Sequence, residues 1–316
     1  MNSDSVLSHW TDRQLPRGDE VFLDHVGYFT HDLIKDGAAL ERLGFQVSQI
    51  NVQTNDDGTG QLVPSGTSNR LARLRRGYLE LLAPTHDTPL GRQAHAALAR
   101  YAGIHLIALS HDDIPAQHDR LTALGFGMQD VVHLRRHDVT LPGTPEVAWS
   151  VLRPQPGVMP EGRIQFTKSH NPEHVWRPEL TRHANAADGL GDILLCVADR
   201  KEAAARFGRY TGRASVEESE RSVIVLERGR LVFVEPGQGE RLLPGFGHPP
   251  LPFIAGQGVR SADIACTRSV LEANHVSPQY ADAELVCVGP ADALGATMLF
   301  HATTLNDPWR ALAQRV

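Results

Sequence analysis

Cysteine is scarce in this sequence, and long apolar runs are absent. The 316 residues include three cysteines, Cys196, Cys266 and Cys287, which lie far apart in apolar surroundings without a Cys-x-x-Cys pair. Neither a disulfide framework nor a thiolate zinc site is therefore indicated, and buried thiols in a reducing compartment account for them better. The longest apolar run, at 193–198, is far shorter than the roughly 20 residues of a membrane span. We therefore expect a cytoplasmic protein with no membrane partner.

Basic clusters are also missing. The net charge is -6, and the Arg-Arg pairs at 75–76 and 135–136 are isolated. These features argue against binding to nucleic acids or anionic membranes. The polar N-terminal residues 1–19 lack a basic region followed by an apolar one, so we expect a loose lead-in and no secretory signal.

Three common catalytic and nucleotide-binding motifs do not occur: GxGxxG after a strand, GxxxxGK[ST] and GxSxG. Residues 170–174 spell His-Asn-Pro-Glu-His, formally the HxxEH motif of zinc peptidases. That motif needs a continuous helix, which Pro172 would interrupt. The better prediction is a short helix that Asn171 caps and Pro172 begins, so a peptidase is not indicated.

The sequence does contain an internal repeat. Residues 23–45 and 103–126 each have a histidine in a short apolar run, an acidic turn, a helical stretch and then Leu-Gly-Phe. His25 stands 19 residues before Gly44, and His105 stands 20 before Gly125. Two histidines at equivalent strand positions predict a site formed by bringing the two copies together.

Hydrophobic periodicity and turn residues predict the order β-α-β-β-β in both copies. The first copy has an expected strand over 21–29, a helix over 31–43 that ends at Gly44, a strand over 45–52, a turn over 55–60, and two strands within 70–82 around Arg76-Gly77. The second has an expected strand over 104–109, a helix over 113–124, strands near 128–134 and 147–153, a loop over 154–162, and a strand over 163–167.

Two further copies follow. The third begins at Gly191, with an Ala-rich helix that ends at Gly212 and strands at 222–227 and 230–235. The fourth is degenerate, from about Val259 to Phe300, with a shortened helix near 268–275, and a Gly- and Pro-rich loop at 236–257 precedes it. Four units form two pairs with a seam within 171–190. The predicted organisation is a lead-in over 1–19, a first pair over 20–175 and a second pair over 176–316.

The order and spacing of five segments resemble the vicinal oxygen chelate superfamily, in particular its glyoxalase-like branch. These segments are LDHV at 23–26, ALERLGF at 39–45, GTSNRLARL at 66–74, GYLELLAP at 77–84 and FTKSHNPEHVWRPELTRH at 166–183. The resemblance implies an α+β fold in which four βαβββ units form two pairs, each pair a curved mixed-sheet cup like those of glyoxalases, bleomycin-resistance proteins and extradiol dioxygenases.

The resemblance also implies a divalent metal inside the first cup, with ligands from the first and last strand of each unit. The matching residues are His25, Glu80, His105 and Gln165. Such a donor set suits Mn, Fe, Co, Ni or Zn. The equivalent residues of units three and four are Asp192, Val232 and about Ala262, so we expect no metal in the second pair.

Further residues are placed in or near the cup by the same resemblance. Asn69 is expected to bond a substrate oxygen, and Arg70 to pair with a carboxylate, although an exposed strand edge is as good a prediction for Arg70. His170, His174 and Trp176 follow the strand of Gln165 and would lie at the rim. His170 or His174 would then transfer a proton, and Trp176 would contact substrate.

The resulting expectation is a metal-dependent enzyme that acts on a small oxygen-chelating substrate. The metal would stabilise an enolate and Glu80 would act as the base, as in isomerases and lyases. Two alternatives stay open: an Fe(II) ring-cleaving dioxygenase, and a metal-free binding or resistance protein in which His25 and His105 bond to one another. Gln165 stands where the dioxygenases have glutamate, which favours the isomerase. A monomer and a homodimer are both compatible with the sequence.

Overall fold

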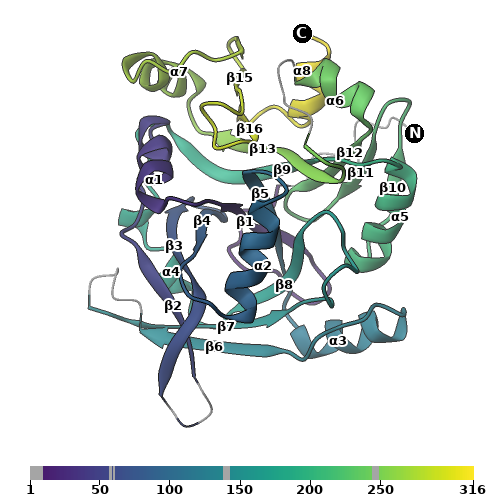
Figure 1. Cartoon of the computed structure of the whole chain (residues 1–316). Coiled ribbons are helices and arrows are strands. Elements are labelled where there is room, and N and C mark those ends of the chain that lie inside the picture. Colours follow the sequence, from purple (N-terminus) through teal and green to yellow (C-terminus); the bar gives the residue numbers. More distant parts are fainter. Residues whose placement is uncertain (1–9, 57–58, 60, 138–142, 244–248) are drawn as a thin grey trace.

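The structure, a computed structural model, describes residues 10–56, 59, 61–137, 143–243 and 249–316. The described chain forms a large curved mixed sheet with helices packed around it, which confirms the predicted α+β fold (Figure 1). No helix in these ranges is long and apolar enough to cross a bilayer.

The first pair of units follows the predicted order closely. Unit one consists of β1 (Phe22–Phe29), α1 (Leu33–Arg42), β2 (Asn51–Asp56), β3 (Leu62–Arg73) and β4 (Tyr78–Pro84). Unit two consists of β5 (Gly103–Ser110), α3 (Ile114–Ala123), β6 (Val132–His137), β7 (Glu146–Leu152) and β8 (Arg163–Ser169). The strand predicted over 45–52 begins only at Asn51, and part of the turn predicted over 55–60 lies outside the described residues.

A helix that the repeat did not predict connects these two units. Helix α2 (Pro89–Leu98) begins at the N-cap Thr88, whose side chain accepts from the amide of Gly91, with Pro89 in the first turn. A Thr-Pro pair is a sequence signal for a helix start, so this helix was detectable. Its buried Ala94 and Leu98 pack against a cluster of strand residues consisting of Phe29, Leu82, Leu106 and Ala108.

The second pair follows after α4 (Pro172–Val175) and the 3-10 helix η2 (Pro178–Leu180). Unit three consists of β9 (Ala187–Cys196), α5 (Arg200–Thr211), β10 (Ser215–Glu217), β11 (Ser222–Val225) and β12 (Arg230–Val234). Helix α6 (Pro236–Leu242) follows. Unit four consists of β13 (Phe253–Ser261), α7 (Ile264–Ala273), β14 (Tyr280–Ala281), β15 (Leu285–Val288) and β16 (Thr297–Ala302), with α8 (Pro308–Ala313) after it.

Unit four is more regular than its sequence indicated. Its first strand begins at Phe253, and its helix spans ten residues from Ile264 instead of a short segment near 268–275. Ala262 comes after this strand, so it is not the inner-face position predicted for it. Helix α6 occupies part of the predicted loop over 236–257, and residues 244–248 of that loop lie outside the described residues.

The first strands of the units hold each pair together. Strand β1 pairs in parallel with β4 and antiparallel with β5, and β5 pairs in parallel with β8. The strand order of the first pair is therefore β2-β3-β4-β1-β5-β8-β7-β6, and β2 lies against β6, so the sheet curves into a cup. In the second pair, β9 pairs with β12 and β13, and β13 with β16. The two halves join where Ile254 of β13 faces Ile104 of β5.

Alternation along β4 decides which side chains face the inside of the first cup. Leu79 and Leu81 belong to the main core between sheet and helices. Tyr78, Glu80 and Leu82, which point the other way, line a cavity on the inner face.

Candidate functional site

The first cup contains a cavity of about 300 Å³. Strands β1, β3, β4, β7 and β8 contribute to its wall, together with the start of α2. Three of the four predicted metal-binding residues, His25, Glu80 and Gln165, line it, as does the predicted substrate-binding residue Asn69. Residues from both repeated units therefore line one cavity on the inner face of the sheet.

His25 is held rigidly by its neighbours. Its Nδ1 lies 2.6 Å from Oδ1 of Asp24, both residues are buried, and its ring stacks on Tyr78 at 4.2 Å between ring centroids. A register shift between Leu23 and His25 in the β1–β5 ladder allows consecutive side chains to meet. Because a carboxylate only accepts hydrogen bonds, Nδ1 carries the hydrogen and Nε2 keeps a lone pair, 3.4 Å from the Tyr78 hydroxyl.

Glu80 is the carboxylate of this cavity. Its Oε1 accepts hydrogen bonds from Nδ2 of Asn69 at 2.6 Å and from Nε2 of Gln53 at 3.3 Å. Asn69 faces Leu82 in the β3–β4 ladder, two pairs away from the Leu71–Glu80 pair and on the same face. The two amides therefore fix the orientation of the carboxylate. Asn69 lines the cavity, where its side chain donates to Glu80 and accepts from Nδ2 of Asn51 at 3.5 Å.

Two arginines that the sequence analysis missed lie beside these residues. Arg153 donates from Nε to Oε1 of Gln165 at 2.9 Å, and Arg163 lines the cavity two residues before Gln165 on the same strand. Arg163 forms no hydrogen bond or ion pair with any residue in the described ranges, and its guanidinium lies 5.2 Å from the centroid of the Phe29 ring. Alternation along β8 was the available signal, because Arg163 and Gln165 share a face.

The electrostatics of this pair are unusual. Burial, with a smaller contribution from the nearby Arg153, lowers the pKa of Arg163 to about 9, and Glu80 opposes this shift. Burial likewise lowers the pKa of Arg153, again opposed by Glu80. Both groups still carry their charge at neutral pH. Arg153 and Arg163 are therefore two cations at this cavity that form no ion pair with a carboxylate among the described residues.

His105 does not join this site. It lies at an irregularity of the β1–β5 ladder, where Gly27 faces Leu106 and Tyr28 faces Ile104. Its Nε2 donates to the carbonyl oxygen of Tyr101 at 2.8 Å, and burial lowers its pKa to about 4. It lines a second cavity and not the first. The structure therefore supports neither a shared metal nor a direct bond between His25 and His105.

Arg70 and Asn69 point to opposite faces of β3. Arg70 donates from Nε to the carbonyl oxygen of Ser48 at 2.7 Å and pairs through Nη2 with Glu41 at 2.8 Å. It thus ties the strand to α1 on the outer side. The expected carboxylate contact in the cup is not available to it, because alternation sends adjacent residues to opposite sides.

The residues expected at the rim also lie outside the cavity wall. His170 is exposed, with Nε2 2.8 Å from Oγ of Ser150, whose side chain faces away from the cup. Nδ1 of His174 lies 2.8 Å from the carbonyl oxygen of Glu146. Trp176 donates from Nε1 to the carbonyl oxygen of Gly77 at 3.1 Å, and its ring centroid lies 6.0 Å from that of Tyr78. Trp176 therefore supports the wall from behind.

The side chains present do not fit the divalent metal that the family resemblance implied. His25 and Glu80 are the only histidine, cysteine, aspartate or glutamate residues among the described residues that line the cavity, and no cluster of three such side chains occurs in the described part of the chain. The Gln165 oxygen already binds Arg153. Two guanidinium groups at the same cavity would repel a divalent cation. The Asp24–His25 pair alone resembles a supported metal ligand, and the other donors are missing.

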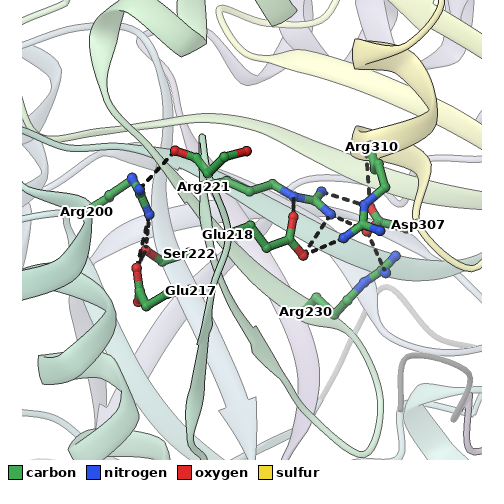
Figure 2. Close-up of polar contacts among 9 residues, drawn as sticks. Arg200, Glu217, Glu218, Arg221, Ser222, Arg230, Asp307 and Arg310 are labelled. Atoms are coloured by element: carbon green, nitrogen blue, oxygen red, sulfur yellow. Dashed lines mark hydrogen bonds and ion pairs between the residues drawn. The ribbon is translucent and has the colours of Figure 1, made fainter. Parts of the chain in front are cut away.

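The second pair uses the corresponding positions differently. Asp192 and Arg230 face each other in the β9–β12 ladder, as His25 and Tyr78 do in the first pair. Arg230 binds Asp192 through two hydrogen bonds, at 2.9 and 2.7 Å. Figure 2 shows that Arg230 also borders an ion-pair network with Arg221, Asp307 and their neighbours. This cup is therefore stabilised by internal ion pairs.

Comparisons with known proteins agree with this fold. A family model described as a glyoxalase-like domain matches residues 23–211, more than half of the chain. A hypothetical protein from Staphylococcus aureus has a similar structure, with a TM-score of 0.62 at 13% identity over 89% of this chain and 99% of that one. No curated protein matches the sequence.

Two enzymes of known activity share the fold as well. A mutant of 4-hydroxymandelate synthase from Streptomyces coelicolor matches with a TM-score of 0.54 at 13% identity, over 90% of this chain and 92% of that one. The halotolerant catechol dioxygenase BphC matches with a TM-score of 0.50 at 13% identity, over 90% and 88%. At such identities the similarity shows the fold alone. Given the family match, the chain belongs to the glyoxalase-like domain family, within the vicinal oxygen chelate superfamily, whose enzymes act on small molecules and generally use divalent metals.

Proposed function

We propose that this protein is a metal-independent enzyme that binds a small organic anion in its first cup and catalyses proton transfer on it. The reaction would be of the isomerase or lyase type, at a carbon next to a carbonyl group. The first pair, residues 20–175, is the functional half in this proposal, and the second pair, residues 176–316, supports it. A cytoplasmic location agrees with the three free cysteines.

The observation that carries the proposal is the unpaired guanidinium of Arg163. Its five N–H donors have no hydrogen-bond partner in the described chain, and Arg153 uses only Nε, for Gln165. Desolvating a charged group without a partner costs several kcal/mol, so such groups persist where a ligand of opposite charge completes them. A carboxylate or phosphate accepts two parallel hydrogen bonds from one guanidinium, which fits this pair of arginines.

The second part of the proposal concerns the proton. Asp24 fixes His25 in the tautomer that leaves a lone pair on Nε2, the arrangement by which a carboxylate supports a histidine base. Glu80 lies on the neighbouring strand, oriented by Asn69, and is the second group able to accept or return a proton. When a base removes a proton next to a carbonyl, negative charge develops on oxygen. Arg153 and Arg163 can stabilise that charge, which is the role the sequence analysis assigned to a metal.

A binding protein without turnover is the second candidate, because the same arginines favour a bound anion whether or not His25 acts. The two candidates differ only in proton exchange. The dioxygenase alternative needs an iron site, and the donor set of this cavity does not provide one.

The test uses protein dialysed against a chelator and 2-oxobutanoate as the probe. Calorimetry measures binding, and NMR in D₂O measures exchange of the hydrogens on C3. We expect binding and exchange without added metal, loss of exchange with retained binding in His25→Gln, and loss of both in Arg163→Gln. Arg241→Gln, at an exposed arginine on α6, is the control. Binding that requires added Mn, Fe, Co, Ni or Zn would contradict the proposal, and binding without exchange would favour the binding protein.

A further inference from the structure

A second cavity, of about 310 Å³, adjoins the first. The two cavities share the side chains of Gln93, Gln129, Arg153 and Arg163. The two arginines thus belong to the walls of both cavities, and the boundary that they mark is called the junction below. His25 and Glu80 line only the first cavity, and His105 lines only the second.

The walls of the two cavities differ in chemistry. The first has the polar side chains His25, Glu80, Asn69 and Gln53 in its wall beside apolar ones. The second is formed largely by apolar side chains of α2, β1, β8 and the loop before β8, namely Phe29, Ala96, Ala97, Met159, Pro160 and Ile164. A ligand that enters both cavities is therefore recognised by polar groups on one side and by apolar contacts on the other.

The loop over 154–162 makes the second cavity a preformed space. It contains three prolines, Pro154, Pro156 and Pro160, each with a fixed φ. Glu161 is buried and accepts hydrogen bonds from Arg206 of α5 at 2.8 and 3.0 Å. At Gly162, where φ is +157°, a Cβ atom would lie 2.5 Å from the carbonyl oxygen of His105. The loop is therefore fixed to α5 at one residue and packed against β5 at the next.

We infer that the substrate is a carboxylic acid with a polar group on its α-carbon and an alkyl chain, with the acid at Arg153 and Arg163, the polar group in the first cavity and the chain in the second. This inference rests on the proposed function and adds the substrate class. The structural reason is charge and shape together. Arg153 and Arg163 are at the junction, His25 and Glu80 line only the first cavity, and the second has a largely apolar wall that also includes Arg100 and His105.

Hydrophobic burial sets the expected size of the effect. Each buried methylene contributes about 0.8 kcal/mol, which corresponds to about fourfold tighter binding. The affinity for unbranched 2-oxo acids should therefore rise about fourfold for each added carbon, from 2-oxobutanoate to 2-oxooctanoate, until the chain fills the cavity. A cavity that took no part in binding would give the same affinity throughout the series.

The experiment measures the dissociation constants of 2-oxobutanoate, 2-oxohexanoate and 2-oxooctanoate for the wild type, Ala97→Trp and Ala97→Leu. Ala97 lines the second cavity only, and the exposed Ala99 at the end of the same helix lines neither, so Ala99→Trp is the matched control. Filling the cavity should abolish the gain with chain length and leave 2-oxobutanoate binding within about twofold, with Ala97→Leu giving a smaller effect. The wild-type series tests the inference even if Ala97→Trp does not fold.

The outcomes distinguish a failure of the substrate inference from a failure of the proposed function. Binding of 2-oxobutanoate without a chain-length dependence overturns the inference and leaves the proposed function intact. A chain-length dependence that Ala97→Trp does not change also overturns it, because the chain then lies elsewhere. No binding of any of the three acids by metal-free protein overturns the proposed function and the inference with it.

Discussion

Gln165 binds Arg153: its Oε1 accepts a hydrogen bond from Nε of the arginine at 2.9 Å. The family pattern assigned this amide oxygen to a metal ion, and in this chain it positions a guanidinium instead. Arg163, on the same face of β8 two residues earlier, adds a second positive charge to the cup. Two guanidinium groups thus lie at the cavity where the family resemblance implied a metal ion.

Replacing Arg163 should separate function from stability. This guanidinium has no hydrogen-bond partner in the described chain. Arg163→Met should therefore stabilise the ligand-free protein, by only roughly 1 kcal/mol because solvent in the cavity screens the charge. It should weaken 2-oxobutanoate binding by about 100-fold, because a charge-assisted contact is lost. Urea unfolding and calorimetry measure the two effects. A destabilised variant that still binds the acid would show that Arg163 has a structural role.

Arg206→Met is the contrasting change. The side chain of Arg206 is also half-buried, but it donates two hydrogen bonds to the buried Glu161. Removing one partner of such a pair leaves an uncompensated charge and costs about 3–5 kcal/mol. Urea unfolding should therefore show a large loss of stability here. A cost below about 1 kcal/mol would mean that the ion pair is replaced by water.

Asp24→Asn should reduce catalysis and leave binding in place. An amide next to Nδ1 no longer holds the hydrogen of His25 on that nitrogen, so the lone pair on Nε2 is no longer assured. By analogy with other carboxylate-supported histidine bases, C3 exchange should fall by a factor on the order of 10²–10⁴. NMR exchange rates, with calorimetry for binding, measure this. His170→Gln and His174→Gln, outside the cavity, should change the rate less than about twofold.

Acid should destabilise the protein through the buried His105 and the half-buried His183. Burial lowers the pKa of His105 to about 4 and that of His183 to about 4, below the usual 6.5. The unfolded chain therefore binds these protons first as the pH falls. The stability that the neutral histidines contribute is full above pH 6.5 and is lost progressively between pH 6.5 and about 4, at up to about 1.4 kcal/mol per pH unit for each.

Urea unfolding between pH 7 and 4 checks this pH dependence. His105→Phe removes one of the two groups and should reduce the slope of the free energy of unfolding by about 1.4 kcal/mol per pH unit. His118→Phe, at a partly exposed histidine of α3, is the control. An unchanged slope in His105→Phe would mean that His105 is protonated as easily in the folded protein as in the unfolded chain.

The ion pairs of the second cup should behave as structural elements. Arg230 and Asp192 are both buried and joined by two hydrogen bonds. Asp192→Asn leaves Arg230 with Asp307 at 3.9 Å as its remaining acidic neighbour, and should cost about 3 kcal/mol of stability. Binding of 2-oxobutanoate by the folded variant should not change. Thermal unfolding and calorimetry measure the two quantities, and a loss of binding would indicate that the second cup takes part in the function.

The sequence was sufficient for the fold because each unit repeats the same local signals. A strand, an Asp-capped helix and a glycine after it recur at His25 and at His105, and helix caps at Asp32 and Asp113 confirm them. Helix α2 was missed because it belongs to no repeat. Its Thr88-Pro89 start is a local signal that is detected only when the segment between the units is analysed without reference to the repeat.

The site was harder to predict than the fold, for two physical reasons. A ladder irregularity at His105 turns an apparently equivalent histidine away from the cup, and no sequence period reports such a shift. A search for metal ligands also passes over Arg153 and Arg163, although alternation from Gln165 places Arg163 on the inner face. Arg70 shows the converse error, because its neighbour Asn69 takes the inner position.

The most direct test of the central claim is calorimetric titration of chelator-treated wild-type protein and Arg163→Gln with 2-oxobutanoate, with and without added Mn, Fe, Co, Ni or Zn. We expect the wild type to bind the acid equally well with and without metal, and Arg163→Gln to bind it about 100-fold more weakly in both conditions. Binding that appears only with metal and survives in Arg163→Gln would contradict it.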